Sequence, residues 1–149
     1  MNSSASLEPF SSHSNDLFLG IDLGTSSVKT LLLSSSGKVL NRSSRPYAVQ
    51  SPHPGWAESN PLAWYSATVQ AVRECVEGHS LEVQAIGLSG QMHSVVLCDE
   101  LGNPLRNAVL WADGRSSAEL ERYRALTPEL LRPLANPLNV GMTGPTLLW

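Results

Sequence analysis

The chain has 149 residues, of which 42% are hydrophobic and 15% are charged, with ten Lys and Arg against thirteen Asp and Glu. This length and apolar content suffice for one globular domain with a buried core. The net charge of −3 argues against a protein that binds nucleic acid through a basic patch. No apolar run approaches the roughly 20 residues of a membrane-spanning helix. We therefore expect neither a nucleic acid nor a membrane as a partner.

The N-terminal residues and the cysteines indicate a cytoplasmic protein. Residues 1–16 are rich in Ser and Asn and lack the basic and apolar segments of a secretory signal, so we expect a disordered tail. Cys75 and Cys98 form neither a disulfide framework nor a metal-binding CxxC pair. The four histidines also lack the spacing of zinc ligands. A reducing compartment is the setting that fits this usage.

The first structured segment is predicted to be a three-stranded antiparallel meander. Short apolar runs at 17–21, 28–33 and 38–40 are separated by two turn sequences, 24–27 and 34–37, which are rich in Gly, Ser and Thr. Runs of this length between such turns are typical of hairpin-connected strands.

A helix is expected after the Pro-rich segment 52–55. Asn60 supplies a capping side chain, and Pro61 suits the first helical position. Apolar residues then recur at steps of three and four through to Gly78, and we expect them to face the sheet. They are Leu62, Tyr65, Val69, Val72 and Val76.

Residues 83–88 predict a further strand, which is parallel to the first because a helix connects the two, and which closes a βαβ unit. A hairpin from 95–98 and 108–111 should follow, and then helices at 116–126 and 128–134. Residues 143–149 open a helix that the sequence does not continue, so we expect the sequence to stop inside a larger architecture. The fold class is α/β.

One turn is a candidate phosphate site. An apolar strand delivers Asp22 to a turn formed by Gly24, Thr25 and Ser26. Backbone N–H groups and hydroxyls of such a turn suit phosphate oxygens, and a carboxylate suits the water ligands of Mg²⁺. The turn lacks the Lys of the GxxxxGK[ST] loop. An ordinary hairpin with a capping Asp is the structural alternative.

Gln91, Met92 and His93 are a second candidate site. They follow the parallel strand, and ligands of open α/β sheets gather at the carboxyl ends of strands. The alternative is a structural His with satisfied hydrogen bonds beside a core Met.

These motifs resemble a known family. Residues 20–25 are similar to the first phosphate motif of the actin-like ATPase superfamily. Four further segments follow in an order and spacing that resemble the amino-terminal part of the FGGY carbohydrate kinases, most closely xylulokinases. These segments are 54–61 with Trp64, 86–93, 109–115 and 144–149. The resemblance implies a ribonuclease H-like α/β domain over 17–149, present as an incomplete sugar-binding domain, with the second, ATP-binding domain absent.

The resemblance also implies an activity, the ATP-dependent phosphorylation of a sugar, most closely D-xylulose. ATP and Mg²⁺ would be the cofactors of the complete enzyme, and a ketopentose would be its small-molecule partner. The resemblance leaves open whether the full-length form is a homodimer. Asp22 would lie at the magnesium and phosphate end, facing Mg²⁺ through water, and Gly24, Thr25 and Ser26 would face the phosphates. The sugar would be bound by Gln91, Met92, His93, Asp113 and Arg115.

Two positions depart from the family pattern. Thr146 stands where a Lys is frequent, and Ala112 replaces a commonly polar residue. In the family the base is an aspartate of a later Gly-Asp-Gln segment, and a second lobe contacts adenosine; this sequence contains neither. We therefore expect the chain alone to transfer no phosphate.

Two alternatives come from other functional classes. A truncated, non-catalytic remnant or a sugar-binding module without kinase turnover fits the same residues. A ribonuclease H-like nuclease needs further carboxylates around the first Asp for two-metal chemistry. Residues 83–88 and the loop after them contain none, so the sequence disfavours a nuclease.

Overall fold

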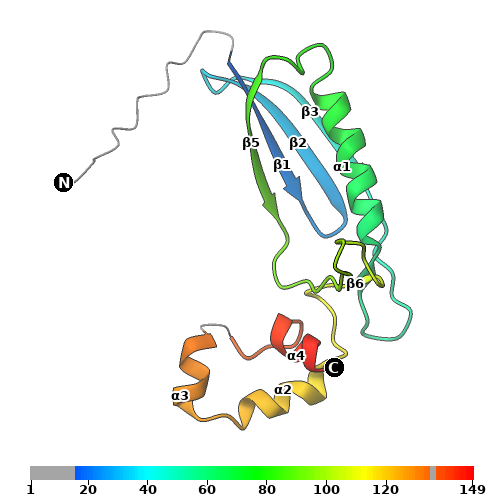
Figure 1. The fold of residues 1–149 in the computed structure, drawn as a ribbon, viewed down its shortest axis with the longest axis vertical. Coiled ribbons are helices and arrows are strands. Elements are labelled where there is room, and N and C mark those ends of the chain that lie inside the picture. The colour runs from blue at the N-terminus through cyan, green and yellow to red at the C-terminus, as the bar shows by residue number, and fades with distance from the viewer. Residues whose placement is uncertain (1–15, 135–136) are drawn as a thin grey trace, which may run out of the picture.

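The structure is a computed structural model that describes residues 16–134 and 137–149. A four-stranded sheet carries one long helix, and three short helices lie beyond one end of the sheet (Figure 1). Of the tail predicted for residues 1–16, only Asp16 is among the described residues. Its carbonyl oxygen accepts a hydrogen bond from the Ser35 N–H at 3.0 Å, so Asp16 is part of the fold.

The sheet has the order β3-β2-β1-β5 and confirms the predicted meander and βαβ unit. Strands β1 (Leu17–Leu23), β2 (Ser27–Ser34) and β3 (Val39–Pro46) are antiparallel, and β5 (Val83–Gly90) pairs with β1 in parallel.

Strand β3 extends beyond the predicted residues 38–40. Its polar residues face the helix, where Asn41 Nδ2 donates to the Cys75 carbonyl at 3.1 Å and Ser43 Oγ donates to Glu74 Oε2 at 2.6 Å. The prediction stopped at Leu40 because the apolar pattern ends there. The rest of the strand contacts α1 through hydrogen bonds in place of apolar side chains.

Helix α1 (Pro61–Cys75) begins as predicted, since the Asn60 side chain accepts the Leu62 N–H at 2.9 Å and Pro61 occupies the first turn. The predicted buried face is wrong in the first part of the helix, where Leu62 and Tyr65 are 59% and 72% exposed, but Val72 and Val76 pack against the core as predicted. The residues that face the sheet are Trp64, Ala67, Ala71 and Cys75. Small side chains bring the helix backbone close enough for Thr30 Oγ1 on β2 to donate to the Ala71 carbonyl at 3.2 Å.

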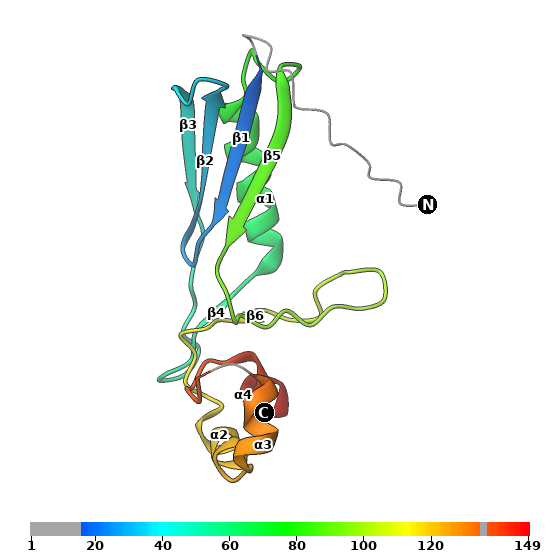
Figure 2. The ribbon, with the colours of Figure 1, turned by 90° about the vertical axis from the view of Figure 1, so that its left-hand side faces the viewer.

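A two-stranded sheet joins the large sheet to the short helices. In it, β4 (Glu58–Ser59) pairs with β6 (Ala108–Val109), and Val95 bridges Val109 on the other side. The predicted hairpin is present as this bridge and a second one between Cys98 and Pro104. Between its ends the chain projects sideways from the molecule (Figure 2). Strand β4 was not predicted, because two residues carry no readable periodicity.

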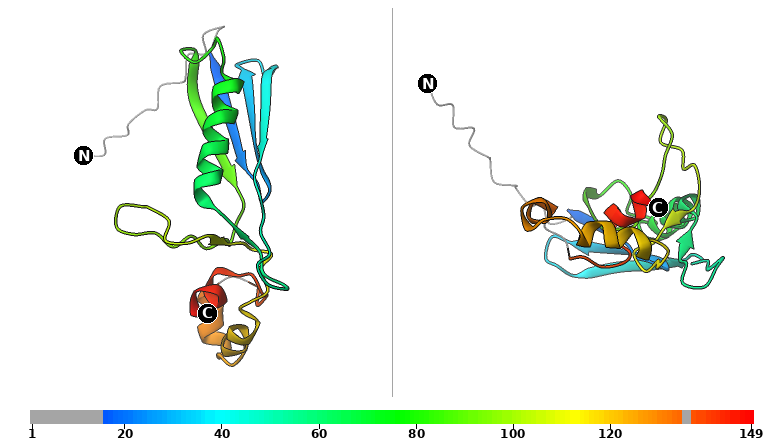
Figure 3. Two further views of the ribbon diagram at one scale, coloured as in Figure 1. Left: turned by 90° about the vertical axis from the view of Figure 1, so that its right-hand side faces the viewer. Right: turned by 90° about the horizontal axis from the view of Figure 1, so that it is seen from below.

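The short helices are α2 (Ser117–Arg124), α3 (Pro128–Leu131), a 3₁₀ turn (Arg132–Leu134) and α4 (Thr143–Leu148). Helices α2 and α4 are one or two residues shorter at their ends than predicted, and the helix predicted for 128–134 divides into α3 and the 3₁₀ turn. The short helices lie together beyond the end of the sheet at which β1 and β5 finish (Figure 3). Among the described residues, no helix combines the length and hydropathy needed to cross a bilayer.

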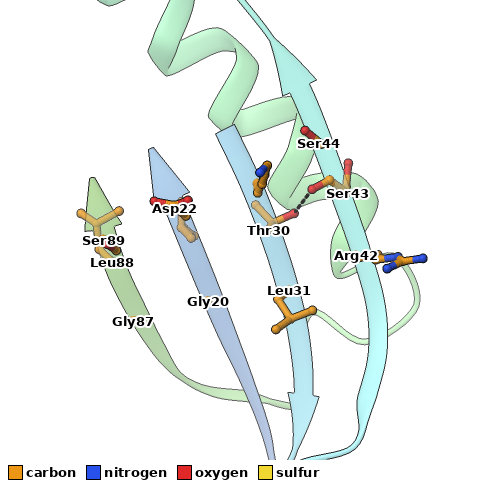
Figure 4. A pocket seen from close by; sticks show the side chains of 12 residues that line it. Gly20, Asp22, Thr30, Leu31, Arg42, Ser43, Ser44, Gly87, Leu88 and Ser89 are labelled. Carbon is orange, nitrogen blue, oxygen red and sulfur yellow. Dashed lines mark hydrogen bonds between the residues drawn. The ribbon is translucent and has the colours of Figure 1, made fainter. Parts of the chain in front are cut away.

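The apolar core lies between α1 and the sheet, where Leu17, Leu19, Leu32 and Cys75 form one buried cluster. Each buried Leu of such a cluster contributes roughly 1.5–3 kcal/mol. No helix of the described residues covers the opposite face of the sheet, where a hollow of about 880 Å³ lies (Figure 4). Asp22 on β1 and Ser89 on β5 stand at the end of this face where both strands finish.

Candidate functional site

Strands β1 and β5 finish side by side, with Leu23 in register with Gly90. The turn after β1 and the loop after β5 therefore start at the same edge of the sheet, where ligands of open α/β sheets bind. A recess of about 400 Å³ opens between them. It is lined by Asp22, Gly24, Thr25, Gly90, Gln91, Met92, His93 and Trp111. Six residues that the sequence placed in two separate sites thus share one recess.

The turn after β1 presents unused hydrogen-bond donors to the recess. It is closed by the Gly24 N–H, which donates to the Ser27 carbonyl at 3.0 Å. A Cβ at Gly24 would lie 3.0 Å from that same oxygen, so the turn requires glycine. Within the described part of the chain, the N–H groups of Thr25 and Ser26 donate no hydrogen bond. Adjacent free N–H groups in a tight turn form the kind of concavity that binds phosphate.

Tyr47 fastens this turn from outside. Its hydroxyl donates to the Gly24 carbonyl, and its N–H donates to the Ser26 carbonyl at 3.0 Å. Burial, with a smaller contribution from the negative charge of Asp22, raises the pKa of Tyr47, so the hydroxyl stays protonated and remains a donor. Ser26 itself does not line the recess and contributes through its backbone. No pattern in the sequence predicts this role of Tyr47, which lies in an irregular segment between β3 and β4.

Asp22 supplies one exposed carboxylate at the rim. It stands in register with Lys29 on β2 and with Ser89 on β5, so a cation that the sequence analysis overlooked lies one strand away. Among the described residues, no group of three or more His, Cys, Asp or Glu could enclose a metal ion. A single carboxylate fits Mg²⁺, which is usually held by substrate phosphates and water with one or two protein carboxylates.

His93 adopts a backbone conformation that is unusual for its residue type. Its φ of 64° makes it the one non-glycine residue with positive φ in the described ranges. Such a conformation costs about 1–3 kcal/mol and is concentrated at functional sites. The imidazole lines the recess and has no hydrogen bond to any described residue, which argues against the alternative of a structural His with satisfied bonds.

The neighbours of His93 also face the recess. Met92 is 72% exposed, so the alternative of a core Met is wrong. Ser94 Oγ donates to Gln91 Oε1 at 3.2 Å, which leaves Gln91 Nε2 buried and without a partner among the described residues. A buried unsatisfied donor costs about 1–3 kcal/mol. A ligand acceptor or a water at this wall would recover that cost.

Trp111 completes the recess and was missed as a site residue. Its indole Nε1 donates to Thr25 Oγ1 at 2.9 Å, and half of its surface is exposed. Its backbone is packed by Gly141, where a Cβ would lie 1.9 Å from the Trp111 carbonyl oxygen. A Trp next to an apolar strand is usually predicted to lie in the core. The partial exposure of Trp111 follows from its position after β6 and beside the phosphate turn, which only the structure shows.

Asp113 and Arg115 do not line the recess and are instead buried in an ion cluster with Glu58. Arg115 Nη2 lies 2.8 Å from Asp113 Oδ2 and 2.7 Å from Glu58 Oε1, and Asp113 Oδ2 also accepts the Ala57 N–H at 2.6 Å. The side chains of Asp113 and Arg115 are each 1% exposed, so they do not form a surface ion pair. Their contact with a sugar stays a prediction.

The ion cluster stays charged because its hydrogen bonds outweigh desolvation. Burial alone would raise the pKa of Asp113 and of Glu58, yet the hydrogen bonds and charge of Arg115 hold the pKa of both carboxyls below their usual values. Burial likewise acts to lower the pKa of Arg115, and the two carboxylates raise it overall.

Two tryptophans cover the guanidinium of Arg115. Its Cζ lies 3.7 Å from the ring centroid of Trp56 and 4.8 Å from that of Trp149, both within cation–π range. Three of the sequence motifs, at 54–61, 109–115 and 144–149, therefore meet at this cluster. The cluster holds these three segments together, and Trp111 of the segment 109–115 lines the recess.

An antiparallel meander, a helix and a parallel strand, with a recess where β1 and β5 end, define a domain of the ribonuclease H-like, actin-like ATPase class. Residues 17–149 match the N-terminal domain of the FGGY family of carbohydrate kinases, and the chain belongs to this family. This membership overturns the nuclease alternative.

Two sequence relatives of the chain are a xylulose kinase and a gluconokinase. A xylulose kinase of Escherichia coli (strain K12) is 40% identical over 134 residues, which are 89% of this chain and 28% of that protein. A gluconokinase of Bacillus licheniformis is 38% identical over 99 residues, or 66% of this chain and 19% of that protein.

A crystal structure described as a xyloylose kinase from Brucella ovis superposes with a TM-score of 0.81 at 36% identity, over 89% of this chain and 28% of that one. The chain thus spans less than a third of the length of these relatives.

Proposed function

We propose that this chain forms the sugar- and phosphate-facing part of a kinase that transfers the γ-phosphoryl group of ATP to a hydroxyl of D-xylulose. The observation that carries the proposal is the single recess in which the phosphate turn after β1 meets the loop after β5. The xylulose kinase relatives support the choice of sugar.

The phosphate end of the proposed site is the turn at Gly24–Ser26. Its free N–H groups at Thr25 and Ser26 would bind phosphate oxygens, and Asp22 would orient the water ligands of Mg²⁺. Bound Mg²⁺ neutralises the charge that develops on the transferred phosphoryl group. The role of this chain is to position the phosphates. The two hydrogen bonds from Tyr47 to the carbonyls of Gly24 and Ser26 stabilise the conformation of the turn that does so.

The sugar end is the opposite wall of the recess. The free imidazole of His93 and the unpartnered Gln91 Nε2 offer polar contacts for sugar hydroxyls. Met92 and Trp111 provide apolar surface for the C–H groups of the sugar, as ligand sites commonly combine a few polar groups with apolar walls. Asp113 and Arg115, which are enclosed here, would act by fixing the segment that carries Trp111.

Transfer to an alcohol also needs a base that takes the hydroxyl proton. Asp22 is the carboxylate among the lining residues, and the proposal assigns it to the metal and phosphate end. We therefore assign the base, and the adenosine contacts, to the remaining part of a polypeptide as long as the relatives.

The test uses the full-length protein and measures ADP release with D-xylulose, gluconate or glycerol, beside a calorimetric titration with D-xylulose. D-xylulose-dependent ADP release supports the proposal. Sugar binding without ADP release would favour the alternative of a sugar-binding module or non-catalytic remnant. ADP release with gluconate alone would keep the kinase and replace its substrate, as the gluconokinase relative illustrates.

The proposal places the enzyme in the cytoplasm, where ATP is abundant. Two free thiols support this setting, since Cys75 is buried and Cys98 is exposed and neither is oxidised to a disulfide.

A further inference from the structure

Among the described residues, no backbone–backbone hydrogen bond involves the N–H or the carbonyl of His93. Its φ of 64° lies in the left-handed region, which side chains with a Cβ rarely adopt. The start of the loop is fixed by the Gln91 N–H, which donates to the Leu23 carbonyl at 2.9 Å. That bond lies two residues before His93 and does not reach its peptide group. A strained residue persists where its surroundings hold it in place.

Thr143, the first residue of α4, reaches this peptide group. Its Oγ1 donates a hydrogen bond to the His93 carbonyl oxygen at 3.2 Å, across 50 positions of sequence. The hydroxyl thus binds the atom whose direction is set by the backbone turn at His93. A different backbone conformation at His93 would point this carbonyl elsewhere and break the bond.

Helix α4, which carries Thr143, packs against α2 and against the segment that contains Trp56. Gly144 packs against the Tyr123 ring of α2 so closely that a Cβ would lie 2.5 Å from the Tyr123 hydroxyl. At the other end of α4, the Trp149 ring contacts the Trp56 ring edge-on with centroids 5.3 Å apart. The short helices and the ion cluster therefore determine where the Thr143 hydroxyl lies.

We propose that Thr143 is a positioning residue for the sugar end of the recess. Its hydroxyl holds His93 in the left-handed conformation that brings the imidazole to the recess, and it thereby connects the α2–α4 helices to sugar binding. The inference rests on the proposed function for its kinetic readout, because the ligand of His93 is the proposed sugar.

The kinetic test compares three variants of the full-length protein. Thr143→Val removes the donor with little change in shape, and Thr143→Ser keeps it. Thr68→Val is the matched control, because the Thr68 hydroxyl donates to the Trp64 carbonyl within α1, away from the recess. We expect Thr143→Val to raise the KM for D-xylulose about two- to tenfold, the usual effect of one hydrogen bond. The KM for ATP should not change, and Thr143→Ser and Thr68→Val should behave as the unaltered protein.

A double variant separates positioning from a general loss of stability. In a His93→Ala background, Thr143→Val should cause no further rise in the KM for D-xylulose, because the imidazole that it positions is gone. Full additivity of the two changes, an unchanged KM in Thr143→Val, or an equal loss in Thr143→Ser would each overturn the inference.

A readout without turnover keeps the inference testable if the proposed function fails. Absence of sugar-dependent ADP release in the unaltered protein would overturn the proposed function alone. In that case the backbone ¹³C shifts of His93, assigned in ¹³C-histidine-labelled protein by comparison with His93→Ala, report its conformation. Thr143→Val should move these shifts away from left-handed values, and unchanged shifts would overturn the inference.

Discussion

The indole Nε1 of Trp111 donates a hydrogen bond to Thr25 Oγ1 at 2.9 Å, although the two residues lie 86 positions apart. The bond joins the turn after β1 to the segment after β6 across the recess. The residues proposed to contact phosphate and those proposed to contact sugar are therefore mechanically linked.

Replacing Trp111 by Phe should loosen the phosphate turn while keeping an aromatic wall. We expect the KM for ATP to rise about two- to tenfold, because one hydrogen bond is lost, and the KM for D-xylulose to change less. Steady-state kinetics of the full-length protein would measure both. Trp149→Phe is the control, since Phe keeps a ring for the edge-on contact with Trp56, and the indole N–H of Trp149 makes no hydrogen bond among the described residues. Trp111→Phe and Thr25→Val should also be non-additive, and independent effects would contradict the link.

Replacing Asp22 by Asn should chiefly lower kcat. The carboxylate is proposed to orient Mg²⁺ at the transferred phosphoryl group, and groups that stabilise developing charge contribute about 10²–10³-fold. The KM for D-xylulose should be nearly unchanged. Glu100→Gln removes an exposed carboxylate on the projecting hairpin and should leave kcat as it is. Full activity in Asp22→Asn would show that the phosphate turn is assigned wrongly.

Replacing His93 by Ala should raise the KM for D-xylulose about tenfold, equivalent to one good hydrogen bond to a sugar hydroxyl. The KM for ATP should stay the same. His79→Ala is the matched control, because His79 is exposed and pairs with Glu82 far from the recess. An unchanged sugar KM in His93→Ala would remove His93 from the site.

The buried ion cluster should make stability dependent on pH in the acid range. The pKa values of Asp113 and Glu58 are lowered in the folded state from 3.8 and 4.5. Their contribution to the free energy of unfolding is therefore present well above these unfolded-state values, and it is lost as the pH falls below them and through the lower folded pKa values. The unfolded chain binds more protons in that window, so Tm should fall there.

Asp113→Asn should flatten this acid dependence, and thermal unfolding between pH 3 and 7 would measure it. Arg115→Met should destabilise at neutral pH by about 3–5 kcal/mol, because it leaves the buried Asp113 without its charged partner and leaves Glu58 with Arg106 alone. Arg124→Met removes an exposed partner of Glu121 and should change stability little. Identical acid dependence in Asp113→Asn and the unaltered protein would contradict the coupling.

Local rules predicted the elements of the sheet because each had its own signal. Apolar runs between Gly- and Ser-rich turns marked β1 and β2, and Asn60 with Pro61 marked the start of α1. The buried face of α1 could not be found in this way. Its apolar residues occupy more than one face, and the choice of Ala71 for the contact follows from the approach of β2, which only the fold defines.

The recess was predictable from strand topology but incompletely. Asp22 lies near the end of β1 and His93 follows β5. These two strands are parallel neighbours, and the sequence predicted their parallel arrangement from the helix that connects them. Trp111 and Tyr47 reach the same place through hydrogen bonds over long sequence separations, for which no local pattern exists. The ion pair between Arg115 and Glu58 could not be predicted either, since the two residues lie 57 positions apart and no local pattern connects them.

The most direct test of the account is a crystal structure of the full-length protein with D-xylulose, Mg²⁺ and a non-hydrolysable ATP analogue. The account predicts the sugar within hydrogen-bond distance of His93 and beside Trp111, with the terminal phosphate at the N–H groups of Thr25 and Ser26. A sugar or phosphate bound elsewhere, such as in the hollow on the bare face of the sheet, would contradict it.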